Sequence, residues 1–484
     1  MWQIFCGGMP LPKERGLHKF HRPADNRRVT EARKSDPRAV ALRILTALEK
    51  GHRTLDQAAD EALARVSLSE KRDRALVTTL VYGVLRWRNT LDHAIVHFSR
   101  TPLQRMDPVV LNILRLGLFQ LRFLDRIPDF AAINSSVELS KQAGLGRLAG
   151  FVNGLLRSST RHPGQPEPPD MDKDPERALS MIKSFPEWMI RRWIARFGIE
   201  KTVQLCDSLN MVPPITVRVN GLRVKAEEVE ASLAKEASNV IPGRHAPEAL
   251  SFSSPKVPVH EMTAFGAGWF QVQDEAAQLV GLLTDPRPGQ RVLDACAGLG
   301  GKTGHLARLM ENQGRIVAAD RDTAKLERLA GEMTRLGITN VRPMTLDMLV
   351  PEQLKDAGGF DRVLADCPCS GTGVIRRNPD TKWRLSEQDL ARLQNDQIAM
   401  LINLADHVRD GGLLVYAVCS MEPEENDAVV QSFLKRRPDF GIDTGVAANV
   451  PAVAGFTDDR GFFRTFPWRH GMDGFFGVRL KKNG

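Results

Sequence analysis

The run Leu293-Asp294-Ala295-Cys296-Ala297-Gly298-Leu299-Gly300-Gly301-Lys302-Thr303 decides the fold of the C-terminal half, because an apolar strand ends there in a glycine-rich turn. The turn leads into a helix predicted over residues 302–311, and its glycines let the backbone approach a ligand closely. Further strands and helices alternate along the chain, and the predicted strands cover residues 291–296, 315–320, 341–346, 361–366 and 411–419. This alternation predicts a mostly parallel sheet with right-handed crossovers, and therefore a doubly wound α/β domain.

The glycine turn fits neither of two common nucleotide-binding fingerprints. A triphosphate-binding loop would need a glycine five positions before Gly301, where Cys296 stands. A dinucleotide fingerprint fails as well, because Thr303 occupies the position of its third glycine. What remains is a nucleoside-bearing ligand without a long polyphosphate, and S-adenosylmethionine fits this description. Asp320, twenty residues after Gly300, is predicted to bind both ribose hydroxyls.

Asp347 follows the third predicted strand of this series. It is expected either to meet the adenine amino group and the backbone beside it, or to cap a helix, and the sequence favours neither role.

Length, charge and cysteine content restrict the class of protein. A chain of 484 residues is too long for one core, so two or three domains are expected. Lys and Arg outnumber Asp and Glu by 67 to 58, and the sequence pI of about 9.3 favours a polyanionic partner. The 6 cysteines are few and irregularly spaced, which favours free thiols in a reducing compartment. Without a long apolar run or a signal peptide, a cytoplasmic protein that does not associate with membranes is expected.

Composition and periodicity predict four segments. Residues 1–36 form a basic flexible tail, and residues 37–162 form an all-helical domain in which Ala41, Ile44, Leu45 and Leu48 have helical spacing. A proline-rich linker over 161–169 ends that domain. Residues 170–270 form a small α/β segment that is expected to bind RNA or to link the domains, and residues 271–484 form the doubly wound α/β domain. No feature predicts an obligate protein partner, so a monomer is expected.

The helical domain resembles the NusB-like RNA-binding fold. The resemblance rests on motifs within most of residues 37–160, namely Ile127-Pro128, Ala132-Ile133-Asn134, Val137-Glu138-Leu139 with Lys141, and Phe151-Val152-Asn153-Gly154-Leu155-Leu156. Apolar residues of these motifs are expected to pack the helices. Arg and Lys on the outer faces are the candidates for RNA contact.

Two thiols stand at the ends of two predicted strands. Cys369 lies in the stretch Ala365-Asp366-Cys367-Pro368-Cys369-Ser370-Gly371-Thr372-Gly373, and Cys419 follows it by fifty positions, after the run Leu413–Val418. Carbon 5 of a pyrimidine is a poor nucleophile until another nucleophile adds to carbon 6, and a thiolate is well suited to that addition. The pair therefore suggests thiol chemistry on a nucleobase, although the sequence alone does not rank the two thiols.

Together these motifs resemble the Sun-type family of RNA cytosine-5 methyltransferases, in its bacterial RsmB-like branch. The shared motifs are, in chain order, residues 294–303, Asp320, Asp347, residues 366–373, residues 376–383, Cys419-Ser420, Glu424-Glu425-Asn426, Pro467, His470-Gly471 and Asp473-Gly474-Phe475-Phe476. The resemblance covers nearly the whole chain beyond residue 37. It implies a Rossmann-like methyltransferase domain with a mostly parallel seven-stranded sheet, S-adenosylmethionine as cofactor, and 16S ribosomal RNA as partner.

The resemblance also implies a role for each residue of the site. Cys419 is the nucleophile that attacks carbon 6, and Cys369 assists product release. Asp366 is expected to hold the cytosine edge at nitrogen 3, and Lys302 is a candidate for the positive charge that stabilises a thiolate. The predicted cofactor-binding residues are Cys296, Ala297, Gly298, Leu299, Gly300, Gly301, Lys302, Asp320, Asp347 and Asp366, and no metal ion is expected.

Three positions depart from the family pattern. Gly298-Leu299 replaces alanine-proline, which is expected to loosen the cofactor loop; Cys367 replaces alanine, and Ala417-Val418 precede Cys419 where serine-threonine is common. Cys367 is expected to be a small buried residue. Arg376, Arg377 and Lys382 are expected either to bind phosphates or to form a solvated basic loop.

The sequence leaves other functions open. Methylation of transfer RNA or DNA would use the same chemistry. A non-catalytic RNA-binding ribosome assembly factor would keep the fold, but it would have no reason to keep both thiols, Asp366 and the glycine turn.

Overall fold

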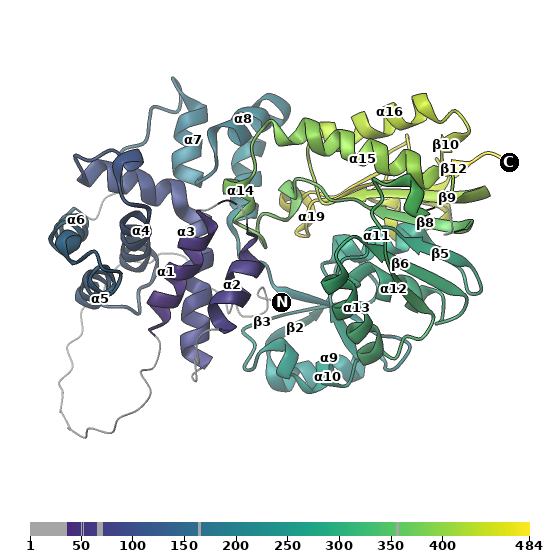
Figure 1. Cartoon of the computed structure of the whole chain (residues 1–484), viewed down its shortest axis with the longest axis horizontal. Coiled ribbons are helices and arrows are strands. Elements are labelled where there is room, and N and C mark those ends of the chain that lie inside the picture. The colour runs from purple at the N-terminus through teal and green to yellow at the C-terminus, as the bar shows by residue number, and fades with distance from the viewer. Residues whose placement is uncertain (1–35, 50, 52, 65–70, 163–165, 355–357) are drawn as a thin grey trace. The chain divides into compact units, whose positions relative to one another are not determined.

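The computed structural model describes residues 36–484 except 50, 52, 65–70, 163–165 and 355–357 (Figure 1). The predicted basic tail therefore lies, apart from Asp36, outside the described residues, as does Cys6. The described chain divides into two units. One contains the residues up to Cys206 together with Asn378–Asp380, and the other contains Asp207–Arg377 and Thr381–Gly484.

Helices are the regular elements of the first unit, as the 3.6-residue periodicity predicts. They are α1 (Pro37–Leu48), α2 (Leu55–Ala64), α3 (Lys71–Phe98), α4 (Pro108–Phe123), α5 (Asp129–Gln142), α6 (Ala149–Arg161), α7 (Pro175–Lys183) and α8 (Glu187–Asn210), with short 3-10 turns at Leu103–Arg105 and Gly146–Leu148. Among the described helices, none has the length and apolar character needed to span a membrane.

The ends and contacts of these helices follow from particular residues. Asp36 caps α1 by accepting a hydrogen bond from the Arg38 backbone N–H at 2.9 Å, and Pro37 occupies the first helical position. Gly83 of α3 faces Phe119 of α4 so closely that a β-carbon there would lie 1.9 Å from the ring. Only glycine therefore lets these two helices pack at this point.

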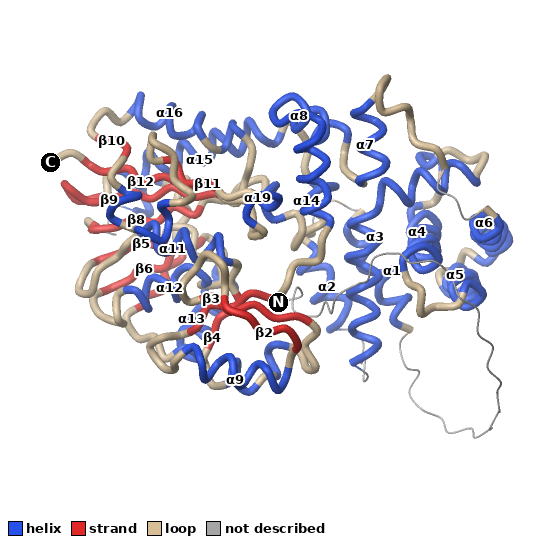
Figure 2. The backbone as a smooth tube through the Cα atoms, turned by 180° about the vertical axis from the view of Figure 1, so that it is seen from behind, coloured by secondary structure: helices blue, strands red, loops and turns tan. Residues whose placement is uncertain are grey.

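The second unit begins with a small antiparallel sheet in the order β2-β3-β1-β4 (Figure 2). Its strands are β1 (Ile215–Val219), β2 (Ser238–Pro242), β3 (Ala249–Ser253) and β4 (Phe270–Val272). Helix α9 (Ala226–Glu236) and the short α10 (Thr263–Gly266) accompany it. All five residues of β1 are buried, so both faces of this strand are covered.

A second sheet forms the centre of the unit, with strands in the order β10-β12-β9-β8-β5-β6-β7. Its parallel strands are β5 (Arg291–Asp294), β6 (Arg315–Asp320), β7 (Val341–Thr345), β8 (Phe360–Asp366) and β9 (Val408–Val418). Two further strands, β10 (Phe440–Ile442) and β12 (Phe476–Lys482), run antiparallel. The predicted mostly parallel sheet is confirmed, but it has eight strands and not the predicted seven, because β11 (Phe462–Arg464) pairs with β12 outside this path.

Helices cover both faces of the large sheet (Figure 1). Val292 of β5 belongs to the core that includes residues of α11 (Glu275–Thr284), α12 (Gly301–Leu309) and α13 (Thr323–Leu336). Its neighbour Leu293 belongs to the core that includes residues of α15 (Asp389–Ala405) and α16 (Asp427–Arg436). The alternation along one strand thus separates two cores, as expected for a doubly wound domain. The remaining short helices are α14 (Thr381–Arg384), α17 (Val446–Asn449), α18 (Pro451–Ala454) and α19 (Pro467–His470), with 3-10 turns at Val259–Glu261, Pro351–Leu354, Thr372–Val374 and Pro423–Glu425.

The parallel arrangement places the ends of four strands at one edge. β5 ends at Asp294, β6 at Asp320, β8 at Asp366 and β9 at Val418, directly before Cys419. The glycine turn and both thiol-bearing loops therefore leave the sheet at its carboxyl edge, where ligands bind in open α/β sheets.

A buried cluster of two arginines and two aspartates ties the loop after Cys369 to distant segments. Arg376 Nε donates to Asp473 Oδ1 at 2.6 Å, and Arg377 Nε donates to Asp473 Oδ2 at 2.8 Å. Both guanidinium groups also bond Asp274, at 3.1 and 2.7 Å. Burial would raise the pKa of Asp274, but the two arginine charges lower it.

This cluster corrects the expectation for the basic residues of the loop. Arg376 is only 5% exposed and ion-paired, so it neither lies in a solvated loop nor presents a free charge to phosphate. Lys382 is fully buried, with its Nζ 2.7 Å from Asn210 Oδ1. A sequence pattern could not identify these partners, because Asp274 and Asp473 lie about 100 residues away on either side.

Replacement of Asp473 by alanine should lower the free energy of unfolding by about 3–5 kcal/mol. The reason is that Asp274 then remains as the one carboxylate of the cluster for two buried guanidinium charges. Urea unfolding followed by tryptophan fluorescence measures this change. Asp459→Ala, at an exposed aspartate of the same segment, is the control and should change stability by no more than about 0.5 kcal/mol. Equal losses in the two variants would contradict the assigned role of the cluster.

Candidate active site

The glycine turn between β5 and α12 is shaped by two residues with left-handed backbone. Gly298 has φ +56° and Gly300 has φ +84°. A β-carbon on Gly300 would also lie 2.9 Å from the Leu329 side chain, so this position requires glycine for two reasons. Beside Gly300, Leu299 leaves 43% of its surface exposed. The structure therefore shows why glycine stands at these positions, and close approach of a ligand to this backbone stays a prediction.

Residues of the small sheet hold the backbone of the same turn. The Arg218 guanidinium of β1 donates to the Gly301 carbonyl at 3.0 Å, and the Gln271 amide of β4 donates to the Gly300 carbonyl at 3.2 Å. Arg218 also donates to Gln271 Oε1 at 2.9 Å, and it is only 2% exposed. Burial lowers the pKa of Arg218 to about 10, so the guanidinium stays charged at neutral pH. Neither Arg218 nor Gln271 is predictable as a site residue from the sequence, because neither belongs to a local motif.

Asp320, the last residue of β6, connects the glycine turn to the loop that follows β6. Its Oδ2 accepts from the Gly298 N–H at 3.0 Å, and its Oδ1 accepts from the Asp322 N–H at 2.9 Å. Each carboxylate oxygen has a second lone pair, so both can accept another hydrogen bond from a ligand.

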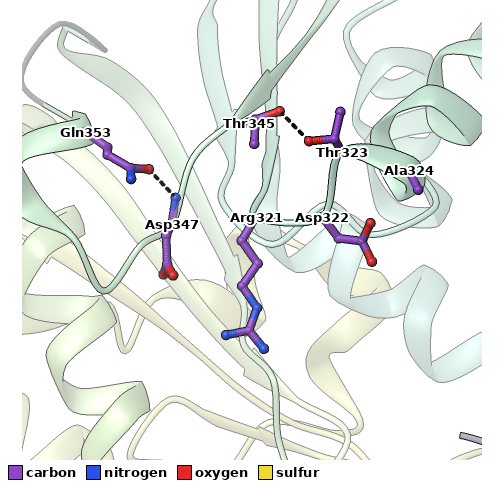
Figure 3. A pocket seen from close by; sticks show the side chains of 7 residues that line it. All are labelled: Arg321, Asp322, Thr323, Ala324, Thr345, Asp347 and Gln353. Atoms are coloured by element: carbon purple, nitrogen blue, oxygen red, sulfur yellow. Dashed lines mark hydrogen bonds between the residues drawn. The ribbon is translucent and has the colours of Figure 1, made fainter. Parts of the chain in front are cut away.

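A cavity of about 680 Å³ opens beside this connection (Figure 3). It is lined by Arg321, Asp322, Thr323, Ala324, Thr345, Asp347 and Gln353. Asp347 lines the cavity, and its Oδ1 accepts a hydrogen bond from the Leu349 N–H at 2.9 Å, so it closes a turn and does not cap a helix; contact with an adenine amino group stays a prediction. Its own N–H donates to Gln353 Oε1 at 2.8 Å (Figure 3). Neither the glycine-turn residues nor Asp320 line this cavity; Asp320 is joined to it only through its hydrogen bond with the backbone N–H of Asp322.

The two thiols predicted from the sequence lie side by side. Cys369 Sγ and Cys419 Sγ are 3.2 Å apart, and both cysteines are free. The Gly373 N–H donates to the Cys419 carbonyl at 3.0 Å, and the Cys367 N–H donates to the Ala417 carbonyl at 3.0 Å, so the two loops are also joined through backbone. The hydrogen bond with Cys419, together with burial, raises the pKa of the Cys369 thiol well above its ordinary value. Cys369 is therefore a neutral thiol in this arrangement.

An ion pair lies next to the thiols. Lys302 Nζ is 2.6 Å from Asp366 Oδ2 and lies 5.0 Å from the centre of the Phe475 ring. Burial would lower the pKa of Lys302, but the charge and hydrogen bond of Asp366 raise it, and Cys419 contributes in the same direction. The ammonium group consequently stays protonated beside Asp366 and Cys419.

Two further residues at the carboxyl edge of the sheet, Asp294 and Cys296, have raised pKa values. Asp294 is fully buried and accepts a hydrogen bond from Thr303 Oγ1 at 2.7 Å. Burial raises the pKa of Asp294 to about 7. Cys367 is 4% exposed, which confirms the expected small buried residue, and its hydrogen bond together with burial raises the pKa of Cys296.

Beneath the thiols, the structure adds a residue whose role sequence analysis did not identify. Glu425 is fully buried and hydrogen-bonds Ser370 and Ser420, the residues that directly follow the two cysteines. The motif Glu424-Glu425-Asn426 was its only signal, and that motif does not indicate what the side chain contacts.

The comparison with protein families identifies three segments of the chain. Residues 281–481 match the model of the 16S rRNA methyltransferase RsmB/F, residues 35–161 match the NusB family, and residues 185–260 match the ferredoxin-like domain of RsmF/B-like methyltransferases. These matches agree with the large sheet, the helical unit and the small sheet. They confirm the resemblance to the RsmB-like branch and to the NusB-like fold.

Individual relatives span nearly the whole chain. The probable ribosomal RNA small subunit methyltransferase B of Bacillus subtilis (strain 168) is 36% identical, over 93% of this chain and 100% of its own length. The ribosomal RNA small subunit methyltransferase B of Vibrio cholerae serotype O1 is 33% identical, over 92% of this chain and 96% of its own.

Among solved structures, the crystal structure of PH0851 matches with a TM-score of 0.77 and 27% identity, over 92% of this chain and 99% of its own. Similarity in sequence and in fold thus extends over the same length. The chain belongs to the 16S rRNA methyltransferase RsmB/F family.

Proposed function

We propose that this protein methylates carbon 5 of a cytosine in 16S ribosomal RNA, with S-adenosylmethionine as methyl donor and a covalent bond between Cys419 and carbon 6. The observation that carries the proposal is the pair of thiols 3.2 Å apart, next to the Lys302–Asp366 ion pair. The names of the relatives, which include small-subunit ribosomal RNA, support the choice of substrate.

The charged groups fit the first step of this reaction. As the Cys419 thiolate bonds to carbon 6, the electron pair of the carbon 5–carbon 6 bond moves into the ring, and nitrogen 3 takes up a proton. Asp366 contacts that edge of the base and shares with it the proton of the Lys302–Asp366 pair. The Lys302 ammonium also stabilises the thiolate before attack, because opposite charges attract strongly at a buried site.

Carbon 5 of the adduct is then nucleophilic enough to accept a methyl group, which S-adenosylmethionine supplies from its sulfonium centre. Release requires two bonds to break. The proton on carbon 5 leaves to a base, the electron pair restores the carbon 5–carbon 6 double bond, and Cys419 departs with the electrons of the carbon–sulfur bond. Nitrogen 3 returns its proton to Asp366. We assign Cys369 to this stage, because its thiol lies 3.2 Å from the departing sulfur.

The residues near the glycine turn fit the proposed cofactor. Asp320 can accept hydrogen bonds from ribose hydroxyls with the lone pairs that Gly298 and Asp322 leave free. Asp347 and Gln353 line the adjacent cavity and offer oxygen acceptors to an adenine amino group. Asp320 has no ion-pair partner among the described residues, and a carboxylate beside the turn favours a ligand that carries a positive sulfonium charge.

The other parts of the chain fit an RNA substrate. The formal net charge is +9, which favours contact with phosphates. NusB-like and ferredoxin-like segments precede the catalytic fold, and we assign to them the choice of site on the RNA. The target base must be unstacked, because a thiol cannot reach carbon 6 within a stack.

Replacement of Cys419 by alanine should abolish the covalent adduct that the wild-type protein forms with 16S RNA containing 5-fluorocytosine and labelled S-adenosylmethionine, because the attacking thiolate is lost. Cys369→Ala should retain the adduct. Mass spectrometry of the conjugates measures both. Dependence of the adduct on Cys369 instead would exchange the two roles, and a wild-type protein that binds RNA tightly without any adduct would favour an assembly factor.

Replacement of Asp320 by alanine should weaken binding of S-adenosylmethionine by about 10- to 100-fold, because hydrogen bonds to a charged group are lost. Isothermal titration calorimetry without RNA measures this affinity. The control Glu327→Ala removes an exposed carboxylate from α13 and should leave the affinity unchanged. Asp347→Ala separates the two roles of Asp347, since unchanged affinity would limit it to closing the turn at Leu349.

A further inference from the structure

Glu425 is a buried carboxylate that no step of the proposed reaction uses. It ends the 3-10 turn Pro423–Glu425, six residues after Cys419, and it is 0% exposed. In the part of the chain that the structure describes, no lysine, arginine or histidine forms an ion pair with it. A buried carboxylate without a paired charge is costly unless hydrogen bonds satisfy its oxygens.

Hydrogen-bond donors fill both carboxylate oxygens. Oε1 accepts from the Ser370 backbone N–H and from the Gln397 side-chain amide, both at 2.9 Å. Oε2 accepts from the Ser420 hydroxyl at 2.5 Å and from the Ser370 hydroxyl. An ionised carboxylate accepts at four lone-pair positions, and these four donors occupy them all. Hydrogen bonds to an ionised carboxylate are stronger than bonds between neutral groups.

The donors belong to the two segments that carry the thiols. Ser370 follows Cys369 and Ser420 follows Cys419. Gln397 of α15 also donates to the carbonyl of Pro368, directly before Cys369, at 3.0 Å. One carboxylate therefore joins both loops immediately behind the reactive sulfurs.

The backbone of Glu425 is fixed as firmly as its side chain. The Tyr416 hydroxyl lies 2.6 Å from the Glu425 carbonyl and 3.0 Å from Gln397 Oε1. Tyr416 belongs to β9, which leads into Cys419, and it is fully buried. Tyr416 thus ties the Glu425 backbone to β9, and the Glu425 side chain contacts Ser420, which follows that strand.

We infer that Glu425 is a positioning residue that holds Cys369 and Cys419 in contact, and that the product-release step depends on it more than the attack on carbon 6 does. The inference rests on the proposed function. Attack uses Cys419 with Lys302 and Asp366, none of which bonds Glu425 in the described structure, whereas release uses both sulfurs together. In that step the carbon 6–sulfur bond breaks with its electrons going to Cys419, the Cys369 thiol gives its proton to the departing sulfur, and the Cys369 thiolate so formed takes up the carbon 5 proton.

The geometric part is tested without RNA or cofactor. Dibromobimane becomes fluorescent when it bridges two nearby thiols, and its bridging rate should be roughly tenfold lower in Glu425→Gln than in wild type. Donors face both oxygens of Glu425, so in either orientation the NH2 group of a glutamine meets donors of one of the two loops, and the loops are expected to separate. Cys369→Ala gives the background from Cys296 and Cys367, and Glu327→Gln at an exposed position is the matched control. Equal bridging rates in Glu425→Gln and wild type would overturn the inference.

The kinetic part separates the two steps. With RNA that contains 5-fluorocytosine, Glu425→Gln should form the trapped adduct at nearly the wild-type rate. With ordinary RNA in a single turnover, decay of the covalent complex should slow by about 10- to 100-fold, so that the complex accumulates as in Cys369→Ala. Equal slowing of adduct formation and decay would indicate a general structural role and would overturn the inference.

A second variant keeps the test decisive if Glu425→Gln does not fold. Ser420→Ala removes a single donor and keeps the carboxylate, so it should slow bridging and release in the same direction but less. Unchanged release in Ser420→Ala together with slower bridging would also contradict the link to release. A wild-type protein that forms no adduct would refute the proposed function, whereas the bridging rates would still decide the positioning role.

Discussion

The parallel pairing of β8 with β9 is the constraint on which the active site depends. Backbone hydrogen bonds align Asp366 with Ala417, so the loops that follow both strands start at the same height of the sheet. Cys369 and Cys419 lie fifty residues apart in the chain and 3.2 Å apart in space for this reason. β5 pairs with β8 on the other side, with Asp294 next to Leu364, and this brings the glycine turn and Lys302 to the same place.

Buried polar groups then refine what the sheet brings together. Lys302 with Asp366 lies on one side of the thiols, and Glu425 with two serines and a glutamine lies behind them. A buried polar network is stabilising only when every member is satisfied, so each of these bonds restricts the positions of the others. The Arg376–Arg377 cluster has a similar effect further along the loop, because it links that loop to α11 and to the C-terminal segment.

Features that depend on residues close together in the chain could be predicted from the sequence. The strand over 315–320 was predicted with its observed limits, and the glycine turn, Asp320 and both thiols lie where strand ends place them. Partners in the folded chain were not predictable from the sequence alone. Arg376 is expected from the sequence to bind phosphates or to lie in a solvated loop, because its aspartate partners lie about 100 residues away; Arg218 and Gln271 belong to no local motif. Residues of this kind depend on how sheets and loops pack, which periodicity does not encode.

Arg218 and Gln271 of the small sheet donate hydrogen bonds to the carbonyls of Gly301 and Gly300. The domain with the large sheet therefore cannot be separated from the small sheet without losing these bonds. A family match that begins at residue 281 suggests a self-contained catalytic module. Yet the turn of that module is braced by an arginine from a strand about 80 residues upstream. The small sheet thus supports the glycine turn of the large-sheet domain directly. Exchange of one without the other would have left the Gly300 and Gly301 carbonyls without these two partners.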